Sequence, residues 1–308
     1  MDFDIKDMEP LWGKWTIGKE LGEGAFGKTW EIHSDREVCA LKQIDILYSD
    51  IDEKRAFIEG ITKEGITYYY KALLEDSLDE IKIMQSLKKC ENIVALEEYE
   101  VVEEDNCGWH ILIRMELLQP LSKYLYENEF DIKAVAKLGT DICKALEECR
   151  KCNIIHRDIK PDNIFYDKSN DIFKLGDFGI AIDLKAPTMV NGRPGTITHM
   201  SPEVYRGEEY TFDDDVYALG IILYRLLNFN RLPLMIVYPQ PFTPKQRNEA
   251  AYNRLRGEKI PLPALCNNSD ITYKLCETVR RAVSEDKSER YISAYEFRKQ
   301  LELVINMI

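Results

Sequence analysis

The sequence is short of positive charge and contains no long apolar run. It has 41 lysines and arginines against 54 aspartates and glutamates, which gives a net charge of -13 at pH 7. Proteins that bind nucleic acids or anionic membranes normally present a basic face, so both classes of partner are disfavoured. The longest nearly apolar stretch, residues 218–227, is too short to span a bilayer and contains Arg225, which indicates a buried helix. The acidic first residues predict no signal peptide.

The spacing of a disulfide framework is also missing. The eight cysteines are scattered, and Cys149 and Cys152 form a CxxC pattern without a second pair or a histidine cluster. We interpret the cysteines as intracellular thiols, with a redox or metal site as the alternative. The expected location is the cytoplasm, either for a complete protein or for the cytoplasmic domain of a longer membrane protein.

The apolar content, 45% of 308 residues, is enough for one large core or for two lobes. The first third of the chain reads mainly as strands and the remainder mainly as helices, with the change near residues 117–121. Within the first third, residues 53–89 have a helical period. The apolar face of this helix carries Glu80, a carboxylate that needs a cationic partner if it is buried.

In the helical part, one amphipathic helix is expected to start at Asp131. Its apolar positions recur at helical spacing: Ile132, Val135, Leu138, Ile142, Leu146 and Cys149. A short β-rich patch follows at residues 153–175. Prolines are dense in residues 228–263, which indicates an irregular surface excursion around one short helix.

Two features of the first third point to phosphate binding. Gly22, Gly24 and Gly27 form a GxGxxG pattern, which plain turns and dinucleotide-binding loops also share. The residues after it indicate a strand and not a helix, so we interpret the segment as a β-hairpin whose backbone N–H groups can approach phosphates, with a plain turn as the alternative. Lys42 is a lone charge in an apolar strand. It is either a solvated edge lysine or the partner of Glu80 and a clamp on nucleotide phosphates.

The strongest signal lies in the middle of the chain. Residues 156–163 read His-Arg-Asp-Ile-Lys-Pro-Asp-Asn, and Asp177 with Phe178 and Gly179 follows fourteen residues after Asn163. Oxygens of Asn163 and Asp177 suit Mg²⁺, which takes few protein ligands together with phosphate oxygens. Asp158 is left to accept the proton of a substrate hydroxyl.

These motifs together resemble the signature set of the eukaryotic-type protein Ser/Thr kinase family, in wording similar to its bacterial members. The resemblance runs from about residue 15 to residue 301. It implies an α+β, bilobal kinase fold, with an N-terminal extension at 1–14, a small β-rich N-lobe with an αC helix at 15–117, and a larger, mainly helical C-lobe at 118–308. It also implies transfer of the γ-phosphoryl group of ATP to protein Ser or Thr hydroxyls, with Mg²⁺ as the metal and Mn²⁺ as an alternative.

The same resemblance implies residue roles. Asp158 would be the catalytic base and Lys160 a contact of the γ-phosphate, while Lys42 would hold the α- and β-phosphates. Asn163 and Asp177 would be the metal ligands. The nucleotide would be bound by the glycine loop, the αC glutamate, the hinge and the adenine slot. The residues of these four parts are Gly22, Glu23, Gly24, Ala25, Phe26, Gly27, Thr29, Ala40, Lys42, Glu80, Met115, Glu116, Leu118 and Phe165.

The resemblance continues past the metal ligands. Residues 195–203 resemble the end of an activation segment, Glu203 is expected to pair with Arg290, and Asp215 is expected to brace the catalytic loop. The chain departs from the family pattern at Thr29, Phe165, Gly176, His199 and Ser201. Ser201 replaces an alanine, which we expect to be a minor change, and Gly176 before Asp177 is expected to loosen that loop. His199 replaces the common tyrosine near the peptide-docking loop, which leaves the substrate preference open.

Regulation by phosphorylation is implied as well. Arg157 is a cation that a phosphate on the activation segment would engage. Thr188 is the favoured acceptor, ahead of Thr198 and Thr196. Autophosphorylation in trans would need a homodimer.

Two other functions stay open. The fold can serve as a non-catalytic scaffold, although the intact Lys42, Asp158, Asn163 and Asp177 disfavour this reading. A small-molecule phosphotransferase is disfavoured by the activation segment. No residue identifies the substrate protein, and the acidic balance is compatible with basic acceptors.

Overall fold

The computed structural model describes residues 4–24, 27–47, 54, 58–104, 108–128, 131–179, 181–183 and 197–308. The chain divides into two compact units, of which the first comprises residues 1–88 and 94–118 and the second residues 89–93 and 119–308. The domain limits expected from the sequence, 15–117 and 118–308, stay predictions. In the part of the chain that is described, no helix combines the length and the apolar content needed to cross a bilayer.

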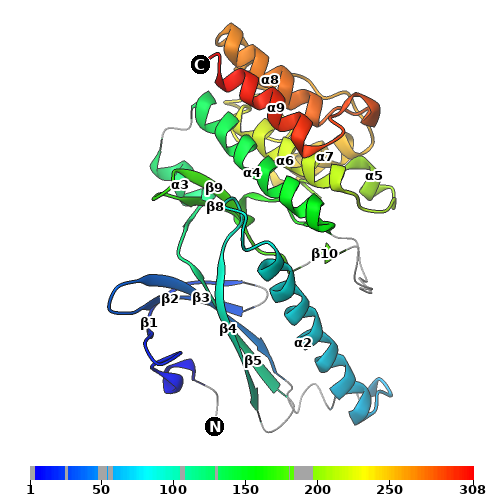
Figure 1. Ribbon diagram of the computed structural model, residues 1–308. Helices are drawn as coiled ribbons and strands as arrows, with labels where there is room; N and C mark the ends of the chain where they lie inside the picture. Colours follow the sequence, from blue (N-terminus) through cyan, green and yellow to red (C-terminus); the bar gives the residue numbers. More distant parts are fainter. Residues whose placement is uncertain are drawn as a thin grey trace. The chain divides into compact units, whose positions relative to one another are not determined.

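The first unit is built on an antiparallel sheet in the order β1-β2-β3-β5-β4, with one long helix beside it (Figure 1). Its elements are a 3-10 helix (Ile5–Met8), β1 (Thr16–Gly24), β2 (Gly27–His33), β3 (Val38–Ile46), α2 (Lys63–Ser86), β4 (Leu96–Glu104) and β5 (Gly108–Glu116). The expected change from strands to a helix and back is confirmed. The side chain of Thr62 accepts a hydrogen bond from the backbone N–H of Gly65 and so caps the start of α2.

The N-terminal extension packs on this sheet. Ile5, Leu11 and Trp15 are buried in one cluster with Ile32 of β2 and Leu112 of β5. The guanidinium of Arg114 lies over the Trp15 ring, 4.8 Å from its centroid, a favourable cation–π distance. The extension therefore contributes to the core of the first unit.

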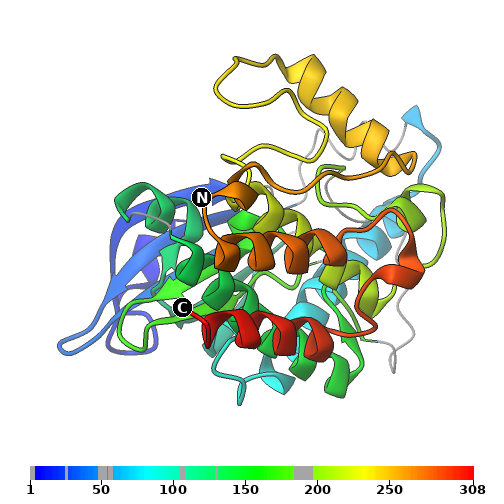
Figure 2. The ribbon, with the colours of Figure 1, turned by 90° about the horizontal axis from the view of Figure 1, so that it is seen from above.

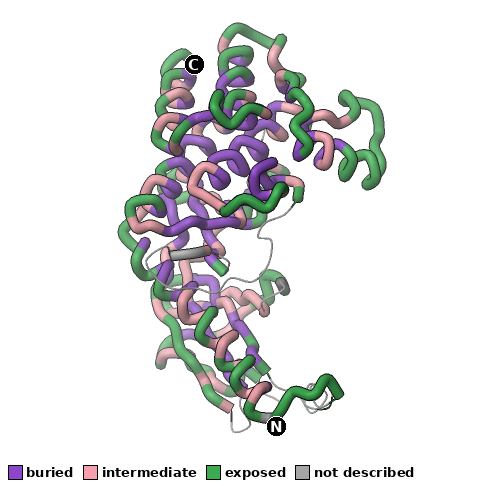
Figure 3. The backbone as a smooth tube through the Cα atoms, turned by 90° about the vertical axis from the view of Figure 1, so that its right-hand side faces the viewer, coloured by how far each residue is buried: buried purple, intermediate pink, exposed green. Residues whose placement is uncertain are grey.

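The second unit is mainly helical, and its buried segments gather along the central helices (Figure 3). Its helices are α3 (Leu121–Glu127), α4 (Ile132–Cys152), α5 (Pro202–Tyr205), α6 (Phe212–Leu226), α7 (Pro244–Leu255), α8 (Asp270–Ala282) and α9 (Ala294–Ile305), with 3-10 turns at Pro161–Asn163, Ala264–Asn267 and Lys287–Glu289. Its short strands are β6 (Gln119–Pro120), β7 (Ile154–Ile155), β8 (Ile164–Asp167), β9 (Ile172–Leu175) and β10 (Ile182–Asp183). The expected α+β class is confirmed.

Helix α4 forms as predicted. The Asp131 side chain accepts a hydrogen bond from the backbone N–H of Ala134, and the helix begins at Ile132. Its predicted apolar face is buried against α6 and α9. The three helices approach closely at Gly139, where an added Cβ would lie 2.7 Å from methyl carbons of Leu223 and Leu301. A larger residue at this position would require the two leucine side chains to shift.

The proline-dense stretch forms the predicted excursion around one short helix. Figure 2 shows α7 and the loop before it standing at the margin of the helical unit. A capping box starts α7, because Thr243 and Gln246 satisfy each other's backbone N–H groups. Buried Ala250, Arg254 and Leu255 attach the helix to the unit.

Candidate active site

The glycine-rich segment is a β-hairpin, as the sequence indicated. Gly24 of β1 faces Gly27 of β2, and Glu23 faces Lys28. Gly27 has a φ of 135°, and an added Cβ would lie 1.8 Å from the carbonyl oxygen of Gln43, so this position requires glycine. At Gly22 an added Cβ would meet nothing within 4 Å, so packing inside the chain does not explain that glycine. Ala25 and Phe26 lie outside the described residues.

Lys42 and Glu80 form the expected ion pair. Lys42 lies in the middle of the sheet, between Thr29 of β2 and Ile113 of β5. Its Nζ donates to Oε1 of Glu80 on α2 at 3.1 Å. The two side chains are only 17% and 7% exposed, so each charge offsets the desolvation cost of the other. The alternative reading of Lys42 as a solvated edge lysine is wrong.

The residues expected around adenine are placed by the same sheet. Ala40 of β3 faces Met115 of β5, and Thr29 faces Lys42. Glu116 ends β5, and its carboxylate accepts the backbone N–H of Ala95 at 2.7 Å, which anchors the strand end. The remaining members, Leu118 after β5 and Phe165 in β8, are both half-buried. The nucleotide contacts of all these residues stay predictions.

In the second unit, Asp158, Lys160 and Asn163 are brought together. Nζ of Lys160 donates to Oδ2 of Asp158 at 2.6 Å, and Nδ2 of Asn163 donates to the same oxygen at 3.1 Å. Nδ2 of Asn163 also donates to the backbone carbonyl of Asp158 at 2.9 Å. These bonds hold one carboxylate oxygen, while Oδ1 of Asp158 accepts no hydrogen bond from the described residues.

His156 connects this loop to the segment that carries Asp177. One ring nitrogen, Nε2, lies 3.1 Å from the carbonyl oxygen of Gly176, which can only accept, so Nε2 carries the proton. The other nitrogen, Nδ1, then accepts the backbone N–H of Asp158 at 3.3 Å. Burial lowers the pKa of His156, in agreement with a neutral ring that uses both nitrogens. The ring also contacts Phe178, with 4.7 Å between centroids.

Gly176 is held on both sides. Its carbonyl accepts from His156, and its N–H donates to the backbone carbonyl of Asn163 at 2.9 Å. The expectation that Gly176 loosens the loop is therefore wrong, because both of its polar backbone groups are bonded. Asp177 follows with a φ of 59°, an unusual conformation for a residue other than glycine.

Two candidate metal ligands fit the chemistry of magnesium. Since Nδ2 of Asn163 is turned to Asp158, its amide oxygen is directed elsewhere, and among the described residues nothing donates a hydrogen bond to it. The backbone bond between Asn163 and Gly176 fixes the chain next to Asp177. No group of three or more His, Cys, Asp or Glu that could hold a metal occurs among the described side chains. Hard oxygen ligands that are few in number suit Mg²⁺ when a phosphate completes its shell.

The loop of residues 156–163, which the resemblance implies to be the catalytic loop, is bonded to Asp215 of α6, as expected. Its Oδ2 accepts the backbone N–H of His156 and its Oδ1 that of Arg157, both at 2.9 Å. The Tyr210 hydroxyl donates to Oδ1 at 3.0 Å. Arg157 has a φ of 69° and is 5% exposed, and its Nε and Nη1 are buried without a hydrogen-bond partner among the described residues. Burial lowers its pKa.

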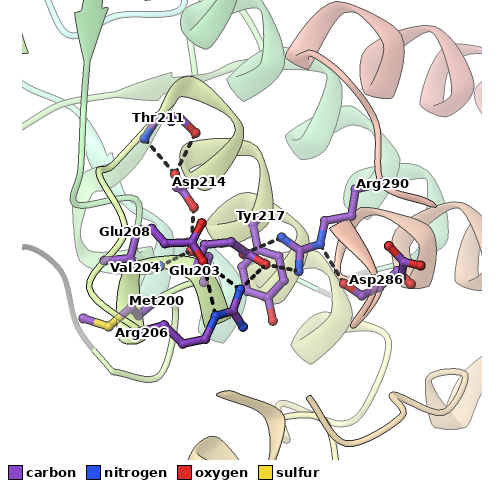
Figure 4. A network of polar contacts seen from close by, with 12 residues as sticks. Met200, Glu203, Val204, Arg206, Glu208, Thr211, Asp214, Tyr217, Asp286 and Arg290 are labelled. Atoms are coloured by element: carbon purple, nitrogen blue, oxygen red, sulfur yellow. Dashed lines mark hydrogen bonds and ion pairs between the residues drawn. The ribbon is translucent and has the colours of Figure 1, made fainter. Parts of the chain in front are cut away.

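The segment that ends at α5 is fixed by ion pairs (Figure 4). Glu203 accepts two hydrogen bonds from Arg290, at 2.8 and 3.3 Å, and one from Arg206 at 3.3 Å, as the figure shows. The expected pair of Glu203 and Arg290 is thus confirmed. Thr188 and Thr196 lie outside the described residues.

Ser201 forms two hydrogen bonds through its hydroxyl. Its Oγ accepts the backbone N–H of Val204, which caps α5, and donates to Oδ1 of buried Asp214 at 2.5 Å. An alanine here would leave both partners without these bonds. The expectation of a minor change stays a prediction, and these two bonds argue against it.

Sequence reasoning missed two buried charges. Arg254 of α7 is 1% exposed and donates to the backbone carbonyls of Ile197 and Met200 and to the Tyr217 hydroxyl, so it holds the chain before α5. Asp141 of α4 is 2% exposed and accepts the backbone N–H of Phe173. Asp141 carried the same signal as Glu80, a carboxylate within an apolar helix face.

Comparisons with known proteins agree with this geometry. The domain pattern described as "Protein kinase domain" matches residues 15–291. Calcium-dependent protein kinase 24 of Arabidopsis thaliana is 30% identical over 220 residues, which cover 70% of this chain and 34% of that protein. Serine/threonine-protein kinase PknB of Mycolicibacterium smegmatis is 34% identical over 165 residues, or 52% of this chain and 24% of that protein.

A third similar protein is serine/threonine-protein kinase DCLK3 of Mus musculus, which is 32% identical over 285 residues. The match covers 89% of this chain and 31% of that protein. The chain spans about a third or less of the length of these three relatives.

Proposed function

Because the chain belongs to the protein kinase family, whose domain pattern covers residues 15–291, we propose that it is a protein Ser/Thr kinase that transfers the γ-phosphoryl group of Mg-ATP to hydroxyls of other proteins. The names of two similar proteins, serine/threonine-protein kinases PknB and DCLK3, support this choice of acceptor. The observation that carries the proposal is the arrangement of Asp158, with one oxygen held by Lys160 and Asn163 and the other accepting no described hydrogen bond.

This arrangement supports a role for Asp158 as the catalytic base. The acceptor hydroxyl would donate a hydrogen bond to Oδ1 of Asp158. This bond would orient the hydroxyl oxygen toward the γ-phosphorus. A bond forms between that oxygen and phosphorus, the bond from phosphorus to the β-phosphate bridging oxygen breaks, and the hydroxyl proton passes to Asp158. The ammonium of Lys160 has two further N–H groups for oxygens of the transferred phosphoryl group.

The nucleotide would be held mainly by charge and by backbone groups. Lys42, anchored by Glu80, would bind the α- and β-phosphates. The hairpin through Gly22, Glu23, Gly24 and Gly27 would cover the phosphates with backbone N–H groups, and the open space at Gly22 favours such an approach. Asn163 and Asp177 would hold Mg²⁺, which neutralises charge on the phosphates when it is bound.

We further propose that phosphorylation of the segment before α5 raises activity. Arg157 supports this, because its buried Nε and Nη1 lack partners and a phosphate would supply them. Thr188 remains the favoured acceptor, ahead of Thr198 and Thr196, and trans-autophosphorylation through a homodimer remains part of the proposal. Phosphosite mapping after incubation with Mg-ATP, before and after phosphatase treatment, tests it. Full activity of the unphosphorylated protein would contradict it.

A location in the cytoplasm is also a proposal. The seven described cysteines are all free, which fits a reducing compartment. Fractionation of cells that express the tagged protein would test this location.

The experiment that tests the main proposal is radiolabel transfer from γ-labelled ATP to a generic basic protein in the presence of Mg²⁺. The change Asp158→Asn is expected to keep ATP binding and to lower turnover by about 10³-fold or more. Asp270→Asn, an exposed change in the first turn of α8, serves as the matched control and should transfer label like the unmodified chain. Near-normal turnover of Asp158→Asn would remove the assignment of the base, and absence of transfer by the unmodified chain to basic and to acidic acceptor proteins alike would argue for a scaffold.

A further inference from the structure

The positive charges of four side chains in the second unit act on one buried histidine. His199, 6% exposed, lies in the chain just before α5. Nη1 of Arg225, near the end of α6, is 3.3 Å from its Nε2. Burial, followed by the positive charges of Arg225, Arg254, Arg247 and Lys160, lowers the pKa of His199 to about 3. In a chain with a net charge of -13, this local gathering of positive charge stands apart.

The protonation of His199 follows from its neighbours. An arginine N–H can only donate, so Nε2 of His199 must accept the bond from Arg225. The ring proton therefore lies on Nδ1, which is 3.2 Å from the Thr198 hydroxyl and donates to it. The histidine is neutral and orients Arg225 without offsetting its charge.

Among the residues that the structure describes, Arg225 forms no ion pair with a carboxylate. Its Nη2 donates to the side-chain oxygen of Asn230 at 2.7 Å, so both of its described partners are neutral. Its Nε is buried and without a hydrogen-bond partner. No carboxylate lies within ion-pair distance of Arg225 or of exposed Arg247 among the residues that the structure describes. Burial lowers the pKa of Arg225 and the charge of Arg247 lowers it further, while Asp162 raises it.

Arg254 also acts on His199, but unlike Arg225 its polar groups are used inside the fold. It is nearly inaccessible, and its guanidinium is occupied by three backbone carbonyls and the Tyr217 hydroxyl. Arg225 is half-buried and Arg247 is exposed, so both can be approached from solvent. A partly desolvated guanidinium that forms no ion pair binds a carboxylate or a phosphate favourably. The desolvation free energy of the guanidinium is already part of the folding free energy and does not have to be supplied again on binding.

We propose that the cationic site formed by His199, Arg225 and Arg247 binds an anionic side chain of the protein substrate, a carboxylate or a phosphate, close to the acceptor Ser or Thr. Lys160 places the site beside the catalytic loop, since its charge acts on His199 and its Nζ binds Asp158. The inference rests on the proposed kinase activity and adds a substrate class to it. The site favours acidic or already phosphorylated acceptor segments, opposite to the basic acceptors that the net charge alone suggested.

The test uses serine peptides that differ only in charge. Each carries alanine, glutamate or phosphoserine at one position at a time on either side of the acceptor. We expect kcat/KM for the best glutamate or phosphoserine peptide to exceed that of the alanine peptide by about tenfold or more at low salt. The preference should shrink as ionic strength rises. The glutamate and phosphoserine series distinguish the two sources of negative charge.

Two variants assign the preference to the site. Arg225→Gln should bring the ratio of kcat/KM between the glutamate and alanine peptides close to one. Arg247→Gln, a change at an exposed residue, should lower this ratio about two- to fivefold. Arg256→Gln, an exposed arginine at the end of the same helix α7, is the matched control and should keep it. Turnover of the alanine peptide by Arg256→Gln should be unchanged, and for Arg247→Gln the ratio of kcat/KM between the glutamate and alanine peptides is the quantity that reports recognition.

The outcomes separate this inference from the proposed function. Equal turnover of all peptides, or an acidic preference that survives both variants, would overturn the anionic-substrate site and leave the kinase proposal standing. If no peptide or protein were phosphorylated, the kinase proposal would fail. Binding of a fluorescent glutamate peptide against its alanine counterpart, measured on the unmodified chain and on Arg247→Gln by anisotropy, would then decide the site by itself.

Discussion

Asp215 accepts the backbone N–H of His156 on one carboxylate oxygen and that of Arg157 on the other, both at 2.9 Å. A buried carboxylate thus fixes two consecutive residues of the catalytic loop, one of which, Arg157, has a left-handed backbone conformation. Burial raises the pKa of Asp215 to about 7, although these hydrogen bonds and that of Tyr210 oppose the shift.

Replacing Asp215 by asparagine should misplace the loop. One oxygen becomes an NH₂ group, which cannot accept, so one of the two backbone N–H groups loses its partner. We expect a loss of about 1–3 kcal/mol in the free energy of unfolding, measured with urea. A fall in kcat of about tenfold to hundredfold should accompany it, because small displacements of a catalytic group are costly. Asp213→Asn, on the same turn of α6, should change neither quantity much, and equal effects of both variants would contradict the bracing role.

Glu80 should be needed to hold Lys42. Glu80→Gln keeps a hydrogen-bond acceptor but removes the negative charge at 3.1 Å from Nζ. We expect kcat/KM for ATP to fall about tenfold to hundredfold while the far-ultraviolet circular dichroism stays unchanged. Asp79→Asn, which breaks the exposed pair of Asp79 with Lys82 on the same helix, is the control and should retain activity. Equal kinetics for the two variants would mean that the pair is structural only.

Arg290 should matter far more than Arg206 for the stability of the segment around α5. Arg290 holds Glu203 with two nitrogens and is 7% exposed, whereas Arg206 is 54% exposed. Arg290→Lys should cost about 1–3 kcal/mol of unfolding free energy through the lost second bond. Arg206→Gln should cost less than about 1 kcal/mol. A double-mutant cycle with Glu203→Gln measures the coupling, and a negligible coupling for Arg290 would refute this ranking.

His199 should make the protein less stable in mild acid. Its pKa is lowered to about 3 in the folded chain, so below its ordinary value of about 6.5 the unfolded chain binds a proton that the folded chain does not. Stability contributed by this group is therefore present above about pH 6.5 and declines toward pH 3, by up to about 1.4 kcal/mol per pH unit. Urea unfolding of His199→Gln, whose side-chain oxygen can still accept from Arg225, should lack this slope. Parallel pH curves for the two proteins would contradict the assignment.

The sequence revealed one pair of residues because each is a charge in a place that demands a partner. Lys42 in an apolar strand and Glu80 on an apolar helix face could be matched because each alone would be costly. Asp131 predicted the start of α4 because an N-cap side chain bonds a backbone N–H only two or three residues later in the chain. The roles proposed for Asp158, Asn163 and Asp177 came from their spacing and from the family resemblance.

Other features depended on packing that no local pattern encodes. Arg254 reaches backbone carbonyls more than fifty residues earlier in the chain. Arg225 entered the sequence analysis only as an argument against a membrane span, since its neighbours His199 and Arg247 come from segments that meet only in the fold. The bonds of Gly176 could not be expected either, because they need His156 and Asn163 already in place.

The bonds around Gly176 have a consequence for how this region can change. Asp215 binds His156, His156 binds Gly176, Gly176 binds Asn163, and Asn163 binds Asp158, so that five residues form one continuous chain of contacts. A substitution at any member disturbs the next, and the effects of paired substitutions will not add. Such a region accepts change only when several members change together, whereas Arg225 and Arg247, the residues proposed to bind the substrate, lie outside this chain of contacts.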